Sequence, residues 1–237
     1  MNTVRTRLFI RANADFKMRC FLLLAMLVLC ASALEDLSGK MFTFPEETNS
    51  AHVKLITTKQ NFGAVTVCHR SITDLKRDHS LFSLATPSAA NDFLVYWEET
   101  TQEIKAHSRD IGVGLRGFDY DPNTWHSMCT TWDSTSGVVQ VWFDGEPSVR
   151  RFLSSGSKIS GQPSIILGQE QDSHGGAFET TQSFVGMMSD VHMWDYILSP
   201  CEIQNYMNSQ GFTPGNVLNW RALNYKIGGN VLTENKT

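Results

Sequence analysis

The sequence predicts an all-β protein, an antiparallel β sandwich or jelly roll, with one short α-helix. Short runs rich in β-branched and aromatic residues recur along the chain, and turn residues such as Gly, Pro, Asn and Asp separate them. Many short strands at such spacing are typical of a two-sheet antiparallel sandwich. The predicted strands cover residues 52–57, 64–69, 81–84, 93–97, 128–132, 138–143, 164–167 and 184–194.

A hairpin is predicted directly after the run at residues 138–143. Asp144-Gly145 follows that run, and an Asp-Gly pair is a strong signal for a two-residue β turn, because such turns need positive φ angles.

One helix is predicted to begin at Ser199. This residue suits the N-cap position, Pro200 suits the first helical position, and Glu202 lies three residues after the cap, which is the pattern of a capping box. Gly211 is predicted to end the helix. We find no internal repeat, linker or charge block, so one domain is expected.

The first 33 residues have the layout of a secretory signal peptide. A basic region precedes an uninterrupted apolar run of 11 residues at 20–30, and Ala31-Ser32-Ala33 supplies the small residues that signal peptidase accepts. The run is too short to span a membrane, which needs about 20 apolar residues; the alternative is a short buried helix. Because the basic region is long, the chain starts at Met1 or at Met18. We expect a signal peptide at 1–33 and a secreted domain at 34–237, with no transmembrane segment.

Composition and charge exclude several classes of protein. The chain has 237 residues, of which 41% are hydrophobic and 19% charged, so it is too apolar for a disordered protein. Its net charge is −4; removal of residues 1–33, with five Lys/Arg and one Asp, would lower this to −8. An acidic chain without a basic run after residue 20 is not expected to have nucleic acid as its main partner. The charge suits a calcium site or a cationic partner, although solvated surface carboxylates are the commoner explanation.

Three cysteines remain after residue 33. Cys68 and Cys129 lie in strand-like runs, whereas Cys201 lies at the predicted start of the helix. Because secretion favours disulfide formation, we predict a bond between Cys68 and Cys129. Cys201 is then either a free thiol or part of a bond between subunits.

The most polar part of the chain is the segment at residues 168–182, which follows a predicted strand. Glu170 and Asp172 lie two residues apart, so both would point the same way in an extended segment. Glu179 and Gln182 are near enough in sequence for the loop to fold back on them. Calcium takes 6–8 oxygen ligands, and this segment offers three carboxylates and several amides. A solvated acidic loop is the alternative.

Enzymatic activity is not expected. Glu170 and Asp172 match part of the carboxylate motif of jelly-roll glucanases, but the second glutamate of that motif is absent, and retaining glycosidases need two carboxylates. The chain also lacks the H-E-x-x-H and G-x-S-x-G motifs of metalloproteases and hydrolases.

Four segments resemble the short pentraxins, the family of C-reactive protein and serum amyloid P component. They are Ile165-Ile-Leu-Gly-Gln-Glu-Gln-Asp-Ser173, Val191-His-Met-Trp-Asp-Tyr-Ile-Leu-Ser-Pro200, Asn216-Val-Leu-Asn-Trp-Arg-Ala-Leu-Asn-Tyr225 and Phe42-Thr-Phe-Pro45. The resemblance implies a flattened, lectin-like jelly roll of two antiparallel sheets with the helix on one face. It also implies the Cys68–Cys129 disulfide, two calcium ions on the opposite face and a homopentamer.

The resemblance also implies the residues that hold the ions. Glu170, the carbonyl of Gln171 and Asp172 match family ligands, and Asn91 matches a ligand of the first ion from a separate strand end. The second, outer ion would be held by Glu179 and Gln182. The sequence departs from the family at Ala90, which stands where the family has an aspartate ligand. Unless Asp92 replaces that carboxylate, we expect weaker calcium binding at the first site.

The ligand pocket departs from the family pattern as well. Leu94 matches an apolar wall residue, Tyr96 replaces a phenylalanine, and Glu103 and Asp110 are the candidates for the carboxylate that meets the choline cation. The family signature has a histidine two residues before the cysteine, where this chain has Ser127; His126 lies one residue earlier.

The resemblance implies a secreted, calcium-dependent recognition protein of innate, acute-phase immunity. It would bind phosphocholine-type ligands or polysaccharides on microbial or damaged-cell surfaces, and its helix face would be free for effectors such as complement components. The alternative is a module of the same fold with a calcium-independent or carbohydrate ligand.

Overall fold

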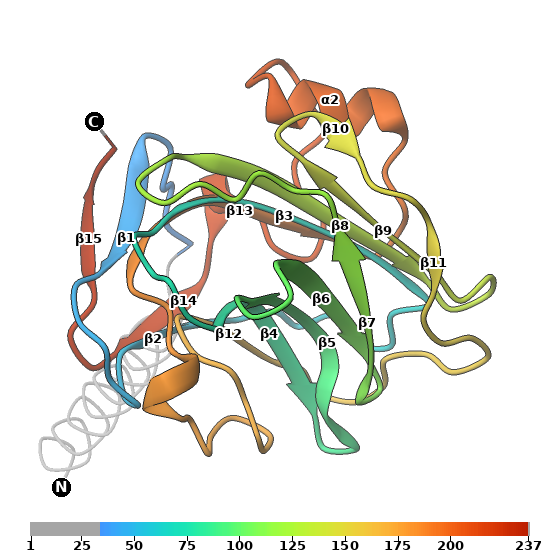
Figure 1. Ribbon diagram of the computed structural model, residues 1–237, viewed down its shortest axis with the longest axis horizontal. Helices are drawn as coiled ribbons and strands as arrows, with labels where there is room; N and C mark the ends of the chain where they lie inside the picture. The colour runs from blue at the N-terminus through green and yellow to red at the C-terminus, as the bar shows by residue number, and fades with distance from the viewer. Residues whose placement is uncertain (1–33, 237) are drawn as a thin grey trace, which may run out of the picture. The chain divides into compact units, whose positions relative to one another are not determined.

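The computed structural model describes residues 34–236 (Figure 1). The predicted signal peptide lies outside the described residues, so the boundary at residue 34 stays a prediction. Within the described range, no helix is long and apolar enough to cross a membrane.

Residues 34–236 form fifteen strands, one α-helix and two short 3-10 helices. The helix α2 spans Pro200–Met207, and the 3-10 helices are η1 (Thr180–Gln182) and η2 (Trp220–Ala222). The strands are β1 (Lys40–Phe44), β2 (His52–Leu55), β3 (Ala64–Ile72), β4 (His79–Thr86), β5 (Ala89–Glu98), β6 (Glu103–Ser108), β7 (Ile111–Arg116), β8 (His126–Asp133), β9 (Val138–Phe143), β10 (Glu146–Pro147), β11 (Arg151–Phe152), β12 (Ser164–Leu167), β13 (Gly186–Trp194), β14 (Tyr225–Gly228) and β15 (Leu232–Asn235).

All eight strands predicted from the sequence form: four extend further than predicted, β9 and β12 have the predicted bounds, and β2 and β13 are two residues shorter. The sequence pattern did not predict β1, β6, β7, β10, β11, β14 and β15. In β7 the strand signal is weakened by Gly112 and Gly114. The structure explains Gly112, because a Cβ there would lie 2.8 Å from the ring of His107 on β6.

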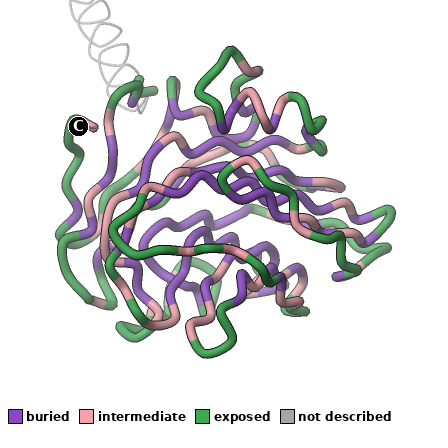
Figure 2. Tube along the Cα trace, turned by 45° about the horizontal axis from the view of Figure 1, so that its top comes forward, coloured by how far each residue is buried: buried purple, intermediate pink, exposed green. Residues whose placement is uncertain are grey.

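The strands form two antiparallel sheets. One has the order β10-β9-β8-β3-β13-β1-β15, with β11 pairing with β9, and the other has the order β14-β2-β12-β4-β5-β6-β7. The sheets lie face to face (Figure 1), and the buried residues follow the strands while the exposed residues follow the connecting loops (Figure 2). The predicted two-sheet antiparallel fold is therefore confirmed.

Strand β5 illustrates how the fold separates core from surface. Phe93, Val95 and Trp97 belong to the central apolar core. Because successive side chains of a strand point to opposite faces, the alternate residues Leu94 and Tyr96 lie on the outer face of the seven-stranded sheet. The predicted ligand-wall residues therefore face away from the core.

Helix α2 packs against the outer face of the other sheet (Figure 1). Its Ile203 and Tyr206 join an apolar cluster with the disulfide and Trp194. The predicted N-cap is confirmed, because Ser199 Oγ accepts a hydrogen bond from the Glu202 backbone N–H at 3.3 Å.

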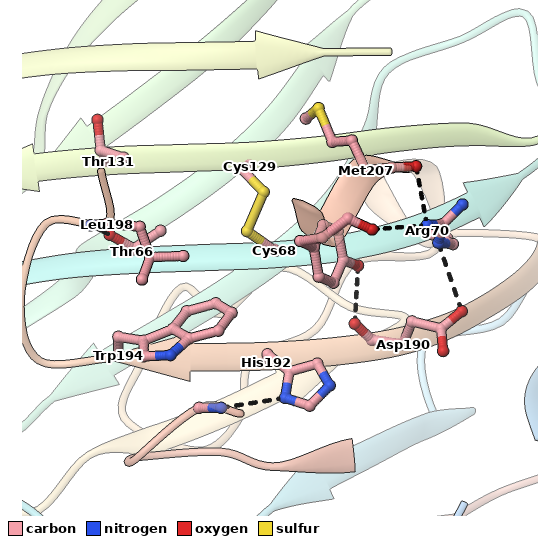
Figure 3. Close-up of a disulfide and its surroundings, with 12 residues drawn as sticks. Thr66, Cys68, Arg70, Cys129, Thr131, Asp190, His192, Trp194, Leu198 and Met207 are labelled. Atoms are coloured by element: carbon pink, nitrogen blue, oxygen red, sulfur yellow. Dashed lines mark hydrogen bonds and ion pairs between the residues drawn. A yellow bond between two sulfur atoms is a disulfide. The ribbon is translucent and has the colours of Figure 1, made fainter. Parts of the chain in front are cut away.

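The predicted end of the helix at Gly211 is wrong, because α2 ends at Met207. One nitrogen of Arg70 donates hydrogen bonds to the carbonyl oxygens of Tyr206 at 2.9 Å and Met207 at 3.1 Å (Figure 3). The arginine comes from β3, which is remote in sequence. The chain itself also closes the helix: Ser209 has a positive φ of 55°, its N–H donates to the Tyr206 carbonyl at 3.1 Å, and the Gln210 N–H donates to the Asn205 carbonyl at 2.8 Å.

The predicted disulfide is confirmed. Cys68 on β3 and Cys129 on β8 are directly opposite each other in the sheet, and their sulfur atoms are bonded (Figure 3). Cys201 is a free, exposed cysteine on α2.

The predicted hairpin at Asp144-Gly145 is also confirmed. Phe143 pairs with Glu146 across it, and Asp144 and Gly145 both have positive φ angles, 47° and 94°. The Asp144 carboxylate accepts a hydrogen bond from the Ser127 N–H at 2.7 Å and lies 2.7 Å from Nδ1 of His126. The hairpin turn is thereby tied to β8.

His126 faces a hydrogen-bond acceptor on each ring nitrogen. Its Nδ1 faces the Asp144 carboxylate, and its Nε2 lies 2.9 Å from the carbonyl oxygen of Asp121. An imidazole can donate to both acceptors only when it is doubly protonated. Burial lowers the pKa of His126, but the hydrogen bonds to Asp144 and Asp121 outweigh it, and the pKa lies above its usual value.

We therefore predict that His126 stabilises the fold more at pH 6 than at pH 9. The pKa of His126 is higher in the folded chain than in the unfolded chain, where it is about 6.5. The stability that follows from this difference is fully present below pH 6.5 and is lost as the pH rises through the folded-state pKa. Since Asp144 is partly exposed, the effect should be roughly 1 kcal/mol or less. Urea unfolding of the wild type and His126→Gln at both pH values measures the difference in their free energies of unfolding. An equal stability difference at the two pH values would contradict the prediction.

Candidate metal and ligand site

The segment after β12 begins with a glycine that the packing requires. Gly168 has φ +90°, and a Cβ there would collide with the ring of Phe44. The chain therefore turns closely over Phe44 and leaves the seven-stranded sheet on the side away from α2 (Figure 1).

Two glutamine side chains attach this segment to the body of the protein. Nε2 of Gln169 donates hydrogen bonds to the carbonyl oxygens of Thr48 at 2.8 Å and Ala51 at 2.9 Å. Nε2 of Gln171 faces the carbonyl and hydroxyl oxygens of Ser83 at 3.2 and 3.0 Å and the carbonyl oxygen of Ser164 at 3.1 Å. Both side chains are buried.

The side chain of Gln171 also shapes the rest of the loop. Its Oε1 accepts a hydrogen bond from the Gly175 N–H at 3.0 Å, so both ends of the amide are occupied. No hydrogen bond from the described residues reaches its backbone carbonyl oxygen. The carbonyl, which is the predicted ligand atom, is thus the part of Gln171 left without a partner.

The carboxylates of this segment lie close enough to affect one another. The pKa of Glu170 is raised to about 7, chiefly by burial and then by the negative charges of Asp172 and Glu179. A hydrogen bond from the side chain of Asn91 offsets part of this effect. The structure therefore brings together Asn91, Glu170, Asp172 and Glu179, which the sequence had separated.

Three predicted ligands carry a buried oxygen that has no hydrogen-bond partner. They are Oδ1 of Asn91, Oε2 of Glu170 and Oε1 of Gln182. Asn91 lies on β5, Glu170 lies in the loop after β12, and Gln182 lies in η1. Other buried side-chain oxygens of the described residues, such as Oδ1 of Asp92 and Oε1 of Gln169, also lack a partner. A hard cation such as calcium, which binds oxygen, would satisfy the three at the predicted ligands. The donor set fits calcium on this observation.

Carboxylates alone do not make this site. Among residues 34–236, no group of three or more His, Cys, Asp or Glu side chains is placed to hold a metal ion. A cation would therefore depend on amide and backbone oxygens as well, including those of Asn91, Gln171 and Gln182.

The turn between β6 and β7 brings a further carboxylate to Asn91. Oδ1 of Asp110 accepts a hydrogen bond from the Asn91 N–H at 2.8 Å, and the Asp110 N–H donates to the Asn91 carbonyl at 3.0 Å. Asp110 also raises the pKa of Glu170. Glu103, the other candidate carboxylate, lies at the opposite end of β6 in an ion pair with Arg116. Of the two, Asp110 is the one beside the site.

Asp92 follows Asn91 on β5. Its Oδ2 accepts a hydrogen bond from Thr86 Oγ1 at 2.7 Å, and burial raises its pKa. Its Oδ1 is buried and has no hydrogen-bond partner among residues 34–236. Replacement of the carboxylate missing at Ala90 by Asp92 therefore stays a prediction.

Sequence reasoning missed Arg77, which holds η1 in place. Its Nη1 donates hydrogen bonds to three carbonyl oxygens, those of Asp78 at 2.9 Å, Thr181 at 3.0 Å and Ser183 at 2.8 Å. Its Nη2 bonds Ser183 Oγ and lies 3.4 Å from the Glu47 carboxylate. No local pattern signals such a role, because Arg77 lies more than 100 residues before η1.

The two predicted ligand-wall residues differ in how much surface they offer. Leu94 is 3% exposed, whereas Tyr96 is half-buried. Tyr96 borders a hollow of about 580 Å³ that Gln182 also lines. Burial and then the charges of Asp78 and Glu170 raise the pKa of Tyr96. The tyrosine thus lies between the acidic loop and the hollow.

Fold and site together define a two-sheet, lectin-like sandwich with an oxygen-rich site on the face away from α2. Among solved structures, the native heptameric SAP-like pentraxin from Limulus polyphemus has this fold, with a TM-score of 0.78 and 22% identity over 84% of this chain and 96% of that chain.

The family model of the Pentaxin family matches residues 40–235. The chain is 44% identical over 205 residues to C-reactive protein of Sus scrofa, which covers 85% of this chain and 89% of that protein. It is 43% identical over 210 residues to serum amyloid P-component of Rattus norvegicus, which covers 85% and 88%. The chain therefore belongs to the pentraxin family, as its motifs predicted.

Proposed function

We propose that this pentraxin is a secreted, calcium-dependent recognition protein that binds phosphocholine-like or related phosphorylated ligands and polysaccharides. The observation that carries the proposal is the set of three buried oxygens, on Asn91, Glu170 and Gln182, that have no hydrogen-bond donor. Membership of the family of C-reactive protein and serum amyloid P-component supports it.

Two calcium ions per chain are proposed, with a division of ligands between them. Asn91, Glu170, the Gln171 carbonyl and Asp172 would hold the first, and Glu179 and Gln182 the outer one. Bound calcium would supply positive charge to which phosphate oxygens can coordinate. Because Ala90 brings no carboxylate, we expect the first site to be weakened unless Asp92, whose Oδ1 is buried without a partner among the described residues, or Asp110 contributes.

The proposed role is recognition, without catalysis. A single weak site gains avidity when several copies face the same repetitive surface, such as a microbial wall or a damaged membrane. We propose a homopentamer that presents its sites on one face and leaves α2 on the other face for effectors such as complement components. Innate, acute-phase defence is the setting that the family supports.

Substitution Asp172→Ala tests the proposal. Asp172 is exposed and has no hydrogen bond or ion pair within residues 34–236, so we expect stability in chelator to change by less than about 0.5 kcal/mol. Calcium-dependent binding of phosphocholine should fall at least about 100-fold, because one ligand carboxylate is lost. Calorimetric titration of calcium, followed by phosphocholine, measures both steps.

Asp119→Ala is the matched control, because Asp119 is also exposed but borders a different hollow, beside Phe143. It should bind as the wild type does. Undiminished binding by Asp172→Ala would refute the mechanism. Phosphocholine or polysaccharide binding that survives chelation would favour the alternative, a module of this fold with a calcium-independent ligand.

A further inference from the structure

One sequence motif belongs to neither the core nor the candidate metal site. Asn235-Lys236-Thr237 has the acceptor pattern for N-linked glycosylation, in which Ser or Thr follows Asn after any residue except proline. No other asparagine of the chain has Ser or Thr two residues later. Thr237 lies outside the described residues. An acceptor asparagine must lie on the surface of a secreted protein, so the place of Asn235 in the fold decides whether the motif is usable.

Asn235 is exposed and ends strand β15 (Figure 1). This strand is the last of its sheet and pairs only with β1 among the described strands, so its other edge has no neighbouring strand. All four of its residues, Leu232–Asn235, are exposed. Because β15 contributes no buried side chain, its separation from β1 uncovers little apolar surface. The folded protein can therefore present this segment to a modifying enzyme.

The side-chain amide of Asn235 leaves its nitrogen free. Its Oδ1 accepts a hydrogen bond at 2.7 Å from Nζ of Lys40, the residue directly opposite on β1. Its Nδ2 has no hydrogen-bond partner among residues 34–236. The bond to Lys40 thus orients the amide without occupying the nitrogen to which a sugar would be attached.

We infer that Asn235 is a site of N-linked glycosylation. The donor is an oligosaccharide carried on a lipid diphosphate. A bond forms between Nδ2 and the anomeric carbon of the first sugar, and the bond from that carbon to the diphosphate oxygen breaks. The diphosphate leaves with the electron pair, and the amide gives up one proton. The inference rests on the secretion proposed above, and it places the sugar on the eight-stranded sheet, whereas Asn91 belongs to the seven-stranded one.

Expression of the full chain in mammalian cells tests the inference. Peptide N-glycosidase F should increase the gel mobility of the secreted wild type, and it should convert Asn235 to an aspartate about 1 Da heavier than asparagine. Asn235→Gln and Thr237→Ala should each abolish the mobility change, the first by removing the acceptor and the second by removing only the hydroxyl that the motif requires. Thr237→Ser keeps that hydroxyl and should keep the change.

Asn230→Gln is the matched control. Asn230 is also exposed, and its Nδ2 lies 3.3 Å from Oε1 of Glu46, but Leu232 stands two residues later, so the acceptor pattern is absent. This variant should show the full mobility change. Persistence of the change in Asn235→Gln, or its loss in Asn230→Gln, would overturn the inference.

The inference and the proposed function fail in different ways. If the wild type is secreted but its mobility is the same before and after the glycosidase, Asn235 is not modified and the proposed function stands. If the chain stays inside the cells without sugar, the proposed secretion fails, and the inference fails with it.

Discussion

Replacing both Cys68 and Cys129 by alanine should lower the free energy of unfolding by about 4 kcal/mol, the value that the chain-entropy model gives for a 61-residue loop. For a chain of this size, that corresponds to a decrease in Tm on the order of 10 °C. The bond joins neighbouring strands, β3 and β8, in the middle of their sheet, so its removal should leave the strand order unchanged.

The measurement is equilibrium unfolding in urea, with wild type, the double variant and Cys201→Ala compared without reductant. Cys201 is exposed and free, so its replacement should leave the midpoint unchanged. The disulfide lies in the apolar cluster under α2, and loss of near-ultraviolet signal from Trp142 and Trp194 should accompany the decrease. An unchanged midpoint in the double variant would show that the unfolded chain is already compact enough to make the bond redundant.

The strands that could be predicted are those whose own side chains carry the signal. The runs at 138–143 and 164–167 are rich in valine and isoleucine, and β9 and β12 have the predicted bounds. Strand β7 escaped prediction because Gly112 and Gly114 replace the side chains that mark a strand, and β6 escaped it because Ile104 is its only β-branched residue. Those glycines are explained by His107 and Glu103 on the neighbouring strand, which the sequence alone does not place there.

The candidate site was predictable where it is local and unpredictable where it depends on sheet register. Glu170, Gln171 and Asp172 are consecutive, and their oxygen-rich pattern follows a strand. Asp110 comes next to Asn91 only because β5 and β6 pair in one register, which carries the β6–β7 turn back to the start of β5. Likewise, Arg77 comes next to η1 only because the strands pair in one register. A one-residue slip would reverse these faces, so the sequence left both Glu103 and Asp110 open.

His126 shows how a one-residue shift changes the role of a side chain. At the family position, now Ser127, a side chain lies on the same face of β8 as Cys129, toward α2. His126 lies on the opposite face with Met128, where it contacts Phe143 and Tyr120 with ring centroids 4.8 and 5.1 Å apart. The departure noted in the sequence therefore exchanges a residue under the helix for a buried histidine that contacts the partly exposed Asp144 at a hairpin.

Replacing Gln171 by glutamate should destabilise the fold by about 3 kcal/mol in the presence of chelator. The variant has the same size, but it places a second oxygen against the carbonyl oxygens of Ser83 and Ser164, and only the Ser83 hydroxyl can turn to donate to it. The group is fully buried, so water cannot relieve the repulsion. Urea unfolding with EDTA measures the loss, and the midpoint should fall as far as it does for Gln171→Ala or further.

Gln60→Glu makes the same chemical change on the surface. Nε2 of Gln60 donates a single exposed hydrogen bond, to Gln162 Oε1 at 2.7 Å, so the cost should stay within about 0.5 kcal/mol. If the two variants cost the same, the buried bonds of Gln171 do not hold the loop, and the description of this segment is wrong.

Calcium affinity then separates two roles for Gln171. If its side chain bound calcium, a glutamate would add a negative charge to the site and affinity would rise. The structure turns that side chain inward and leaves the backbone carbonyl without a partner. We therefore expect Gln171→Glu to weaken calcium binding at least about 10-fold, because Glu170 and Asp172 lose the anchor between them. Asp172→Ala should weaken binding without lowering stability in EDTA, so the pair of variants distinguishes a positioning residue from a ligand.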